Sequence, residues 1–235
     1  HAKLCVIKKR VNNKTIQYGF VSTGNLNEKT AKIYVDHLLM TSNRAIMADI
    51  NKVFNVFRKP KIDPVLALKS CNHLLVCPHF MREKIEWHID KEIEEAKAGR
   101  KAEMIIKVNS LSDKGLIKKL YEAAEAGVEI KMIVRGIFCA VEQKNFKKKI
   151  HAISIVDEYL EHSRVMYFYN KGSEDVYLSS ADWMTRNLDY RIEAAVKVNQ
   201  KNLKKELKDL LELQLKGNVK ARFLDEDLTN KYVKN

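Results

Sequence analysis

Proline and glycine are scarce in this chain, which has 3 Pro and 8 Gly among 235 residues. Disordered and low-complexity chains are usually rich in both residues and poor in apolar ones, whereas 46% of these residues are hydrophobic. A folded chain of this length buries a substantial core, and two domains are plausible. The composition therefore indicates a folded, globular protein.

Long apolar runs are also missing. No run approaches the roughly 18 to 20 apolar residues that a membrane-spanning helix needs, and the chain opens with no secretory signal. The first residue is His and not Met, so we expect the numbering to start inside a longer protein.

Cysteine is sparse, and no two cysteines form a C-x-x-C pair. The four are Cys5, Cys71, Cys77 and Cys139. This spacing favours reduced residues in or near the core of a cytoplasmic protein over a disulfide framework or a metal site.

Basic residues outnumber acidic ones, giving a formal net charge of +13 and an isoelectric point near 9.4. Such a balance suggests a polyanionic partner, which could be nucleic acid, anionic lipid or a phosphate-rich substrate. A lysine-rich solvated surface is the alternative, and charge alone does not choose between them.

The first quarter of the chain has its own pattern. Two strand-like stretches flank the turn signal "NNK", which predicts a hairpin over residues 2–22. Apolar spacing predicts a helix within residues 27–57. Two of the three prolines fall within residues 58–64, so we place a domain boundary there and divide the chain into domains 1–62 and 63–235.

The second part alternates between strands and helices. A β-α-β-α-β run predicts a parallel sheet with crossover helices, with Ser112 as the N-cap of the second helix and Gly127 at its end. The expected strands are 73–78, 102–110, 128–136, 165–170, 175–180 and 191–198, and the expected helices are 80–98, 112–127 and one around 203–211. The tail after Lys220 is expected to be irregular.

One pattern occurs twice. "STGNLNEK" (22–29) aligns with "SSADWMTR" (179–186), so that Asn25 matches Asp182 and Lys29 matches Arg186. Each block follows a strand, a turn and another strand.

A His-x-cation stands at the head of each first strand, as His1 with Lys3 and as His162 with Arg164. The copies are offset by 161 residues at the histidines and by 157 at the serines, which a difference in hairpin length explains. Strand-end histidines, solvated cations and turn residues explain each position singly, but they do not explain the repetition.

Two halves that each supply a histidine and cations suit one phosphate-handling site at their interface. A neutral imidazole can attack phosphorus, and a second imidazole can act as an acid or base or hold a phosphate oxygen. The cations would neutralise the charge of the transferring group. Arg135 follows an apolar strand, and ligands gather at such strand ends, so it is a candidate phosphate clamp or, alternatively, an ordinary surface arginine.

These motifs resemble those of the phospholipase D superfamily, which repeats H-x-K-x4-D followed by a G-S/G-x-N element. The sequence departs from that pattern, because Lys8 and Tyr169 occupy the two aspartate positions and Arg164 occupies the second lysine position. A typical phosphodiesterase of the superfamily is therefore a poor match in detail.

The chain is more similar to the type 1 polyphosphate kinases, whose C-terminal domains share that fold. "HAKLCVI", "STGNLNEKTAKIYVDHLLMT", "IVRGIFC", "AISIVDEYLEHSRVMYF" and "VYLSSADWMTRNLDYRIE" look like blocks of this family in its order. The resemblance implies an α/β fold of two phospholipase D-like domains related by a pseudo-twofold repeat, the first one truncated at its N-terminus.

The resemblance also implies an activity, which is reversible transfer of the terminal phosphate of ATP to polyphosphate through a phosphohistidine. His1 matches the phosphorylated position, Tyr34 matches a nucleotide-contacting tyrosine, and Arg135 and His162 match further ATP-contacting positions. Catalysis is expected from His1, His162, Lys3 and Arg164, and the remaining phosphate-binding candidates are Lys29, Arg186, Asn25 and Asp182.

The family needs Mg²⁺, whose ligands we expect upstream of this chain, so no metal ligand is assigned here. ATP or ADP and polyphosphate are the expected partners, nucleic acid is not, and the complete enzyme is expected to be a homo-oligomer that can associate peripherally with a membrane. Phe20 stands where many members have His, and the lysines of segment 142–149, which replaces a Pro- and Gly-containing loop, are expected to face water. Two alternatives stay open, a phosphodiesterase or nuclease of the same superfamily and a non-catalytic polyanion-binding module.

Overall fold

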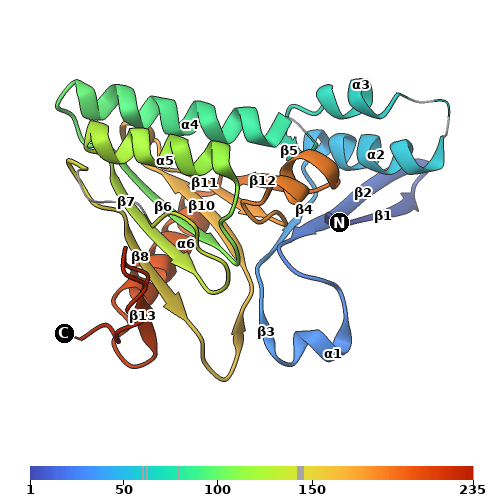
Figure 1. The fold of residues 1–235 in the computed structure, drawn as a ribbon. Helices are drawn as coiled ribbons and strands as arrows, with labels where there is room; N and C mark the ends of the chain where they lie inside the picture. Colours follow the sequence, from blue (N-terminus) through green and yellow to red (C-terminus); the bar gives the residue numbers. More distant parts are fainter. Residues whose placement is uncertain (60, 62, 79, 142–145, 235) are drawn as a thin grey trace.

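The structure is a computed structural model that describes residues 1–59, 61, 63–78, 80–141 and 146–234. Two sheets form its framework, a smaller one of three strands and a larger one of eight strands (Figure 1). No helix within the described residues is long and apolar enough to cross a membrane.

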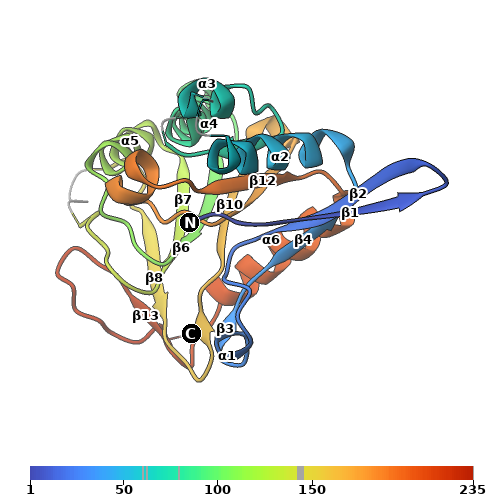
Figure 2. The ribbon, with the colours of Figure 1, turned by 90° about the vertical axis from the view of Figure 1, so that its right-hand side faces the viewer.

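The smaller sheet is antiparallel and has the strand order β1-β2-β4, with β1 at Lys3–Val11, β2 at Lys14–Ser22 and β4 at Leu38–Thr41. Asn12 and Asn13, with positive φ angles of 48° and 59°, turn the chain between β1 and β2. The hairpin projects from the body of the molecule (Figure 2). The predicted hairpin over residues 2–22 is confirmed.

The helix expected within residues 27–57 is only partly correct. The short helix α1 (Glu28–Ala31) and the strands β3 (Tyr34–Val35) and β4 come first, and the long helix α2 is restricted to Arg44–Arg58. Asn43 starts α2, because its side chain accepts hydrogen bonds from the backbone N–H groups of Ala45 and Ile46. Leu38 is exposed and Leu39 is buried, which is the period-2 pattern of a strand and not a helical spacing.

The larger sheet has the order β13-β8-β7-β6-β10-β11-β12-β5. Its strands are β5 (Leu74–Val76), β6 (Glu103–Val108), β7 (Glu129–Val134), β8 (His151–Ile155), β10 (Arg164–Phe168), β11 (Asp175–Ser179), β12 (Ala194–Val198) and β13 (Ala221–Phe223). Among the described strands of this larger sheet, only β6, β7 and β8 pair in parallel. The expected parallel sheet is therefore wrong as a description of the whole, because β5 joins the far edge antiparallel to β12 and β10–β12 form an antiparallel meander.

Two strands of this sheet were not expected. β8 lies within a stretch that has few turn signals around it, and β13 falls in the tail that we expected to be irregular. These two strands pair with each other. This pairing stabilises strands that the two short sequences do not predict by themselves.

Helices cover both faces of the larger sheet. α4 (Phe80–Lys97) and α5 (Lys114–Ala126) lie side by side over one face (Figure 1), and they bury a cluster that includes Met104 and Met132. Gly127 ends α5 in the left-handed conformation, with φ 96°, as expected. Its N-cap is Asp113 and not Ser112, because the Asp113 carboxylate accepts from the Leu116 N–H.

The opposite face of the larger sheet packs against the smaller sheet, α2 and α6 (Lys201–Leu215) in a second cluster. Ile50 of α2 and Tyr167 of β10 belong to this one cluster, and both are 0% exposed. The short helix α3 (Pro64–Lys69) connects the two parts, with Asp63 as its N-cap and Pro64 at its first turn. The two parts therefore share a core, and the boundary between residues 62 and 63 remains a prediction.

Residues 142–145 of the lysine-rich segment 142–149 lie outside the described residues. Lys147, Lys148 and Lys149 are exposed.

Candidate active site

The sequence repeat is also a repeat in space. Lys3 of β1 pairs across the hairpin with Ser22, and Arg164 of β10 pairs with Ser179. The two serine hydroxyls accept hydrogen bonds in the same way, from the N–H of Gly24 at 3.2 Å and from the N–H of Ala181 at 3.1 Å. Two α/β halves related by a pseudo-twofold repeat are therefore confirmed.

Each half is bonded to the segment that follows the Ser block of the other half. The Ala2 N–H donates to the Ile192 carbonyl at 2.8 Å, and the Ser163 N–H donates to the Val35 carbonyl at 3.0 Å. Next to this second contact, β3 pairs in parallel with β9 (Leu160–Glu161). The crossed contacts bring both histidine segments to the interface between the halves.

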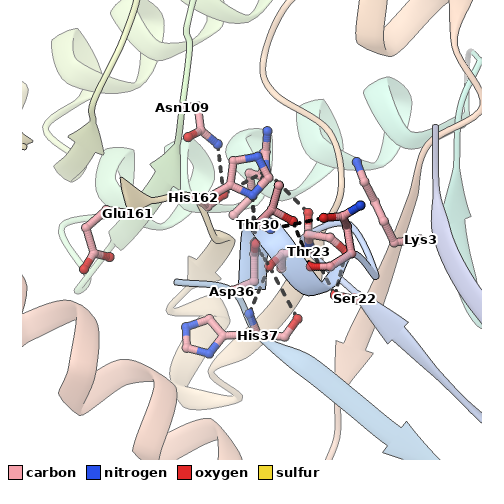
Figure 3. A network of polar contacts seen from close by, with 12 residues as sticks. Lys3, Ser22, Thr23, Thr30, Asp36, His37, Asn109, Glu161 and His162 are labelled. Atoms are coloured by element: carbon pink, nitrogen blue, oxygen red, sulfur yellow. Dashed lines mark hydrogen bonds and ion pairs between the residues drawn. The ribbon is translucent and has the colours of Figure 1, made fainter. Parts of the chain in front are cut away.

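His162 is held by a carboxylate from the first half (Figure 3). Its Nδ1 lies 2.9 Å from Asp36 Oδ2, and the Thr23 hydroxyl donates to Asp36 Oδ1 at 2.6 Å. Burial alone would raise the pKa of Asp36, but the hydrogen bonds from His162 and Thr23 outweigh it and hold the pKa below its usual value. The ring of Tyr34 lies 4.9 Å from the His162 ring.

His1 is held by a carboxylate from the second half. Its Nδ1 lies 3.3 Å from Glu193 Oε1. Glu193 is fully buried and accepts from the Ser180 hydroxyl at 2.5 Å and from Asn187 Nδ2 at 2.9 Å. Each half therefore supplies a histidine to the site and a carboxylate that contacts the histidine of the other half.

Asp36 and Glu193 were missed by the sequence analysis, although a signal was present. Each lies 13 residues after the second residue of its Ser block, Thr23 in the first half and Ser180 in the second. Extending the alignment past residues 29 and 186 would have paired the two carboxylates.

A buried cation accompanies each of the two histidines. Arg164 is 6% exposed, and its Nη2 pairs with Asp182 Oδ2 at 3.0 Å. Its Nη1 lies 3.0 Å from His162 Nε2 and donates to the Thr23 carbonyl at 3.4 Å. Arg164 therefore bridges the two halves.

Lys3 is the cation of the first half, and it is 9% exposed with its Nζ 3.4 Å from His1 Nδ1. Burial lowers the pKa of Lys3, and the negative charge of Glu193 opposes this while the positive charge of Arg164 adds to it. Lys3 pairs with Ser22, and the carbonyl of the next residue, Thr23, accepts a hydrogen bond from Arg164, so the two pockets adjoin each other.

The other predicted residues lie in different surroundings. Arg135 follows β7, and its Nε donates to Asn109 Oδ1 at 2.6 Å, while the Asn109 amide donates to the His162 carbonyl at 2.9 Å. Asp182 is engaged by Arg164 and is therefore not free to bind another cation. Lys29 in α1, Arg186 in the short π-helix η2 (Arg186–Tyr190) and Asn25 are exposed.

Within the described part of the chain, no group of three or more His, Cys, Asp or Glu side chains could hold a metal ion. These residues therefore do not fit a magnesium site by themselves.

Comparison with known proteins agrees with this geometry. The family model for the polyphosphate kinase C-terminal domain 1 matches residues 1–62, and that for domain 2 matches residues 74–235. The polyphosphate kinases of Yersinia pestis and Vibrio cholerae are 44% and 43% identical over 99% of this chain. The chain spans about a third of the length of these relatives, 33% in both cases.

A solved structure matches as well. The crystal structure of polyphosphate kinase from Porphyromonas gingivalis superposes with a TM-score of 0.91 and 43% identity, covering all of this chain and 36% of that one. Since the two family models account for nearly every residue and carry the repeated histidine segments, the chain belongs to the polyphosphate kinase family.

Proposed function

We propose that this chain carries the phosphoryl-transfer centre of a polyphosphate kinase, which moves the terminal phosphate of ATP reversibly onto inorganic polyphosphate. One observation carries the proposal, which is the pair of crossed histidine–carboxylate contacts around the buried cations Lys3 and Arg164. The names of the relatives supply the substrates.

The contacts distinguish the two histidines. Nε2 of His162 faces the Arg164 guanidinium, which can only donate, while its Nδ1 faces Asp36. Both ring nitrogens of His162 are therefore engaged by protein groups. The His1 side chain is 49% exposed, and among the described residues only its Nδ1 has a polar contact. His1 is therefore the better nucleophile, with Nε2 as the attacking atom.

The reaction then proceeds in two reversible displacements. His1 Nε2 attacks the terminal phosphorus of ATP, the Nε2–P bond forms, and the bond from phosphorus to the bridging oxygen breaks to release ADP. The terminal oxygen of a polyphosphate chain next attacks this phosphorus and displaces the imidazole. Lys3 and Arg164 neutralise charge on the transferring group, and Glu193 stabilises the positive charge that the His1 ring acquires.

The remaining residues have supporting roles in this proposal. Tyr34, beside the His162 ring, is assigned to the nucleotide and Arg135 to phosphate. Lys29, Arg186 and Asn25 are exposed candidates for contacts with the polyanion, and Asp182 orients Arg164. The proposal also includes a cytoplasmic location, which the four free cysteines support. The complete enzyme is proposed to be a homo-oligomer that associates peripherally with a membrane and needs Mg²⁺ bound outside this chain.

The test is covalent labelling of the complete protein with ATP that carries ³²P at its terminal phosphate. We expect an alkali-stable, acid-labile label on His1 that chases into polyphosphate, no label in His1→Ala, and a strongly reduced rate in His162→Ala. A nuclease or phosphodiesterase would instead cleave a bis-ester substrate without nucleotide. A binding module would show salt-sensitive affinity for polyphosphate and no label.

A further inference from the structure

Asn109 lies next to proposed site residues but has no role in the proposed reaction. It directly follows β6, and Arg135 directly follows β7. The two strands are parallel neighbours whose last residues, Val108 and Val134, pair. Asn109 and Arg135 therefore meet at the carboxyl edge of the sheet, where ligands of open α/β sheets gather.

The main chain and the side chain of Asn109 both make hydrogen bonds. Its side-chain Oδ1 accepts from Arg135 Nε at 2.6 Å, and its Nδ2 donates to the His162 carbonyl at 2.9 Å. Its backbone N–H donates to Asp182 Oδ1 at 2.7 Å, and its carbonyl accepts from the Gly136 N–H at 2.8 Å.

The surroundings leave little freedom for these contacts. Asn109 is 4% exposed. A Cβ added at Gly136 would lie 2.8 Å from the Asn109 carbonyl oxygen, so this close approach requires glycine there. The Asn109 side chain thus links the Arg135 guanidinium to the His162 backbone, and its backbone N–H adds a link through Asp182 to the Arg164 guanidinium.

The side chain must be both acceptor and donor to make this link. A guanidinium only donates and a carbonyl oxygen only accepts, and a carboxamide offers one group of each kind in a fixed plane. An aspartate would keep the acceptor and lose the donor. Its negative charge would also offset the positive charge of Arg135.

We propose that Asn109 is a positioning residue that fixes the Arg135 guanidinium relative to His162, so that both address the same transferring phosphoryl group. This role rests on the proposed function, since it gives Arg135 a phosphate to bind. Asn109 acts through Arg135 and does not itself contact the reacting atoms.

The experiment measures ATP-dependent polyphosphate synthesis by the complete protein and its variants. We expect Asn109→Ala to lower kcat about tenfold, with a change in KM for ATP of less than threefold, because the lost contact serves the transition state more than ground-state binding. Asn109→Asp, which has the same shape, should lose at least as much. The matched control is Asn51→Ala on α2, which likewise removes an amide with two hydrogen bonds, in this case both donated and to partners outside the proposed site.

A double-mutant cycle with Arg135→Lys separates positioning from general stability. We expect Asn109→Ala to cost less than twofold in kcat when Arg135 is already lysine, because Lys lacks the Nε contact. The positioning role would be overturned if Asn109→Ala lowered kcat by the same factor with Arg or Lys at position 135. It would also be overturned if the activity of Asn109→Ala were within twofold of wild type. If Asn109→Ala does not fold, as judged by its thermal melt, Asn109→Asp decides the question in the same cycle. If the wild-type protein makes no polyphosphate, the proposed function fails, and this role fails with it.

Discussion

Each histidine of the site is paired with a carboxylate from the opposite half, Asp36 for His162 and Glu193 for His1. A carboxylate at Nδ1 fixes the orientation of each ring. At His1 this leaves Nε2 to face the reacting group, whereas Nε2 of His162 contacts Arg164. The crossed pattern also means that neither histidine pocket is complete within its own half.

The first prediction concerns Asp36→Asn in the complete protein. The amide keeps the shape but can present its NH₂ group to Nδ1, which favours the wrong tautomer of His162. We expect the rate of polyphosphate synthesis to fall tenfold or more, measured as initial rates at pH 7. Glu193→Gln is the matched change in the other half and should reduce the labelling of His1 in particular. A rate for Asp36→Asn within twofold of wild type would contradict the assigned role.

A second residue-scale prediction concerns stability and His88 of α4. This side chain is 2% exposed, stacks on Phe168 with ring centroids 4.6 Å apart, and has its Nε2 3.0 Å from the Tyr177 hydroxyl. Burial lowers the pKa of His88 to about 4, against a weaker opposing effect of Asp175. As the pH falls below the ordinary histidine pKa of 6.5, the unfolded chain takes up a proton that the folded one refuses.

The free energy of unfolding should therefore fall between pH 6.5 and pH 4, by up to about 1.4 kcal/mol per pH unit from this group. His88→Gln keeps a polar contact for Tyr177 but does not titrate, so its unfolding free energy should depend less steeply on pH in that window. Urea unfolding at pH 7, 5.5 and 4.5 measures both slopes, and equal slopes would show that His88 does not stay neutral in the folded state.

The residues found from sequence and those missed differ in a physical way. His1, Lys3, His162 and Arg164 stand at fixed spacings along the chain, so the repeat exposed them. Asn109 has no such spacing, since its partners Arg135 and His162 become neighbours only when β6 pairs with β7 and β10. Without the sheet order, which the chain's local patterns do not specify, that contact could not be predicted.

At the scale of elements, the repeated unit is a hairpin followed by a tight turn that leads to the carboxylate. Gly24 and Ala181 occupy the same place in the two turns, but their surroundings differ. A Cβ added at Gly24 would lie 1.8 Å from Asp36 Oδ2, whereas the second half accommodates the Ala181 methyl group in a buried position.

The third prediction is that Gly24→Ala displaces the Asp36 carboxylate and so loosens His162. We expect polyphosphate synthesis by the complete protein to fall more than tenfold while the protein stays folded, measured by initial rates and circular dichroism. Ala181→Gly, the matched change in the other turn, should cost less than Gly24→Ala in activity. Equal losses for the two variants would argue against the contact with Asp36.

Element types were predictable where the periodicity was long and regular, as in α4, α5 and α6. They were not predictable where tertiary pairing decides. Residues 34–41 form strands because β3 meets β9 and β4 meets β2, and β13 exists because β8 is beside it. The antiparallel placement of β5 likewise depends on β12, which lies more than 100 residues later in the chain.

At the scale of the whole molecule, the two halves are unequally covered. In the second half β10 lies between β11 and β6, and α4 and α5 cover the outer face of the sheet. In the first half, β1 is an edge strand within the described residues. The face of its sheet that points away from α2 exposes apolar side chains from all three strands, which are Ile7, Ile16, Tyr18, Leu38 and Met40.

This inequality leads to the last prediction, which concerns the activity of the 235-residue chain by itself. In the proposed site, Arg135 at the end of β7 binds phosphate and Asn109 at the end of β6 positions Arg135, whereas the first half has no counterpart of either strand among the described residues. We therefore expect the chain alone to bind polyphosphate, with an affinity that falls as salt rises because of its charge of +13, but to transfer phosphate at less than a hundredth of the rate of the complete protein. Parallel assays of the two proteins with labelled ATP, at equal molar concentration and with folding checked by circular dichroism, measure that ratio. A rate for the chain alone within tenfold of that of the complete protein would show that β6 and β7 of the second half are sufficient, without counterparts in the first half.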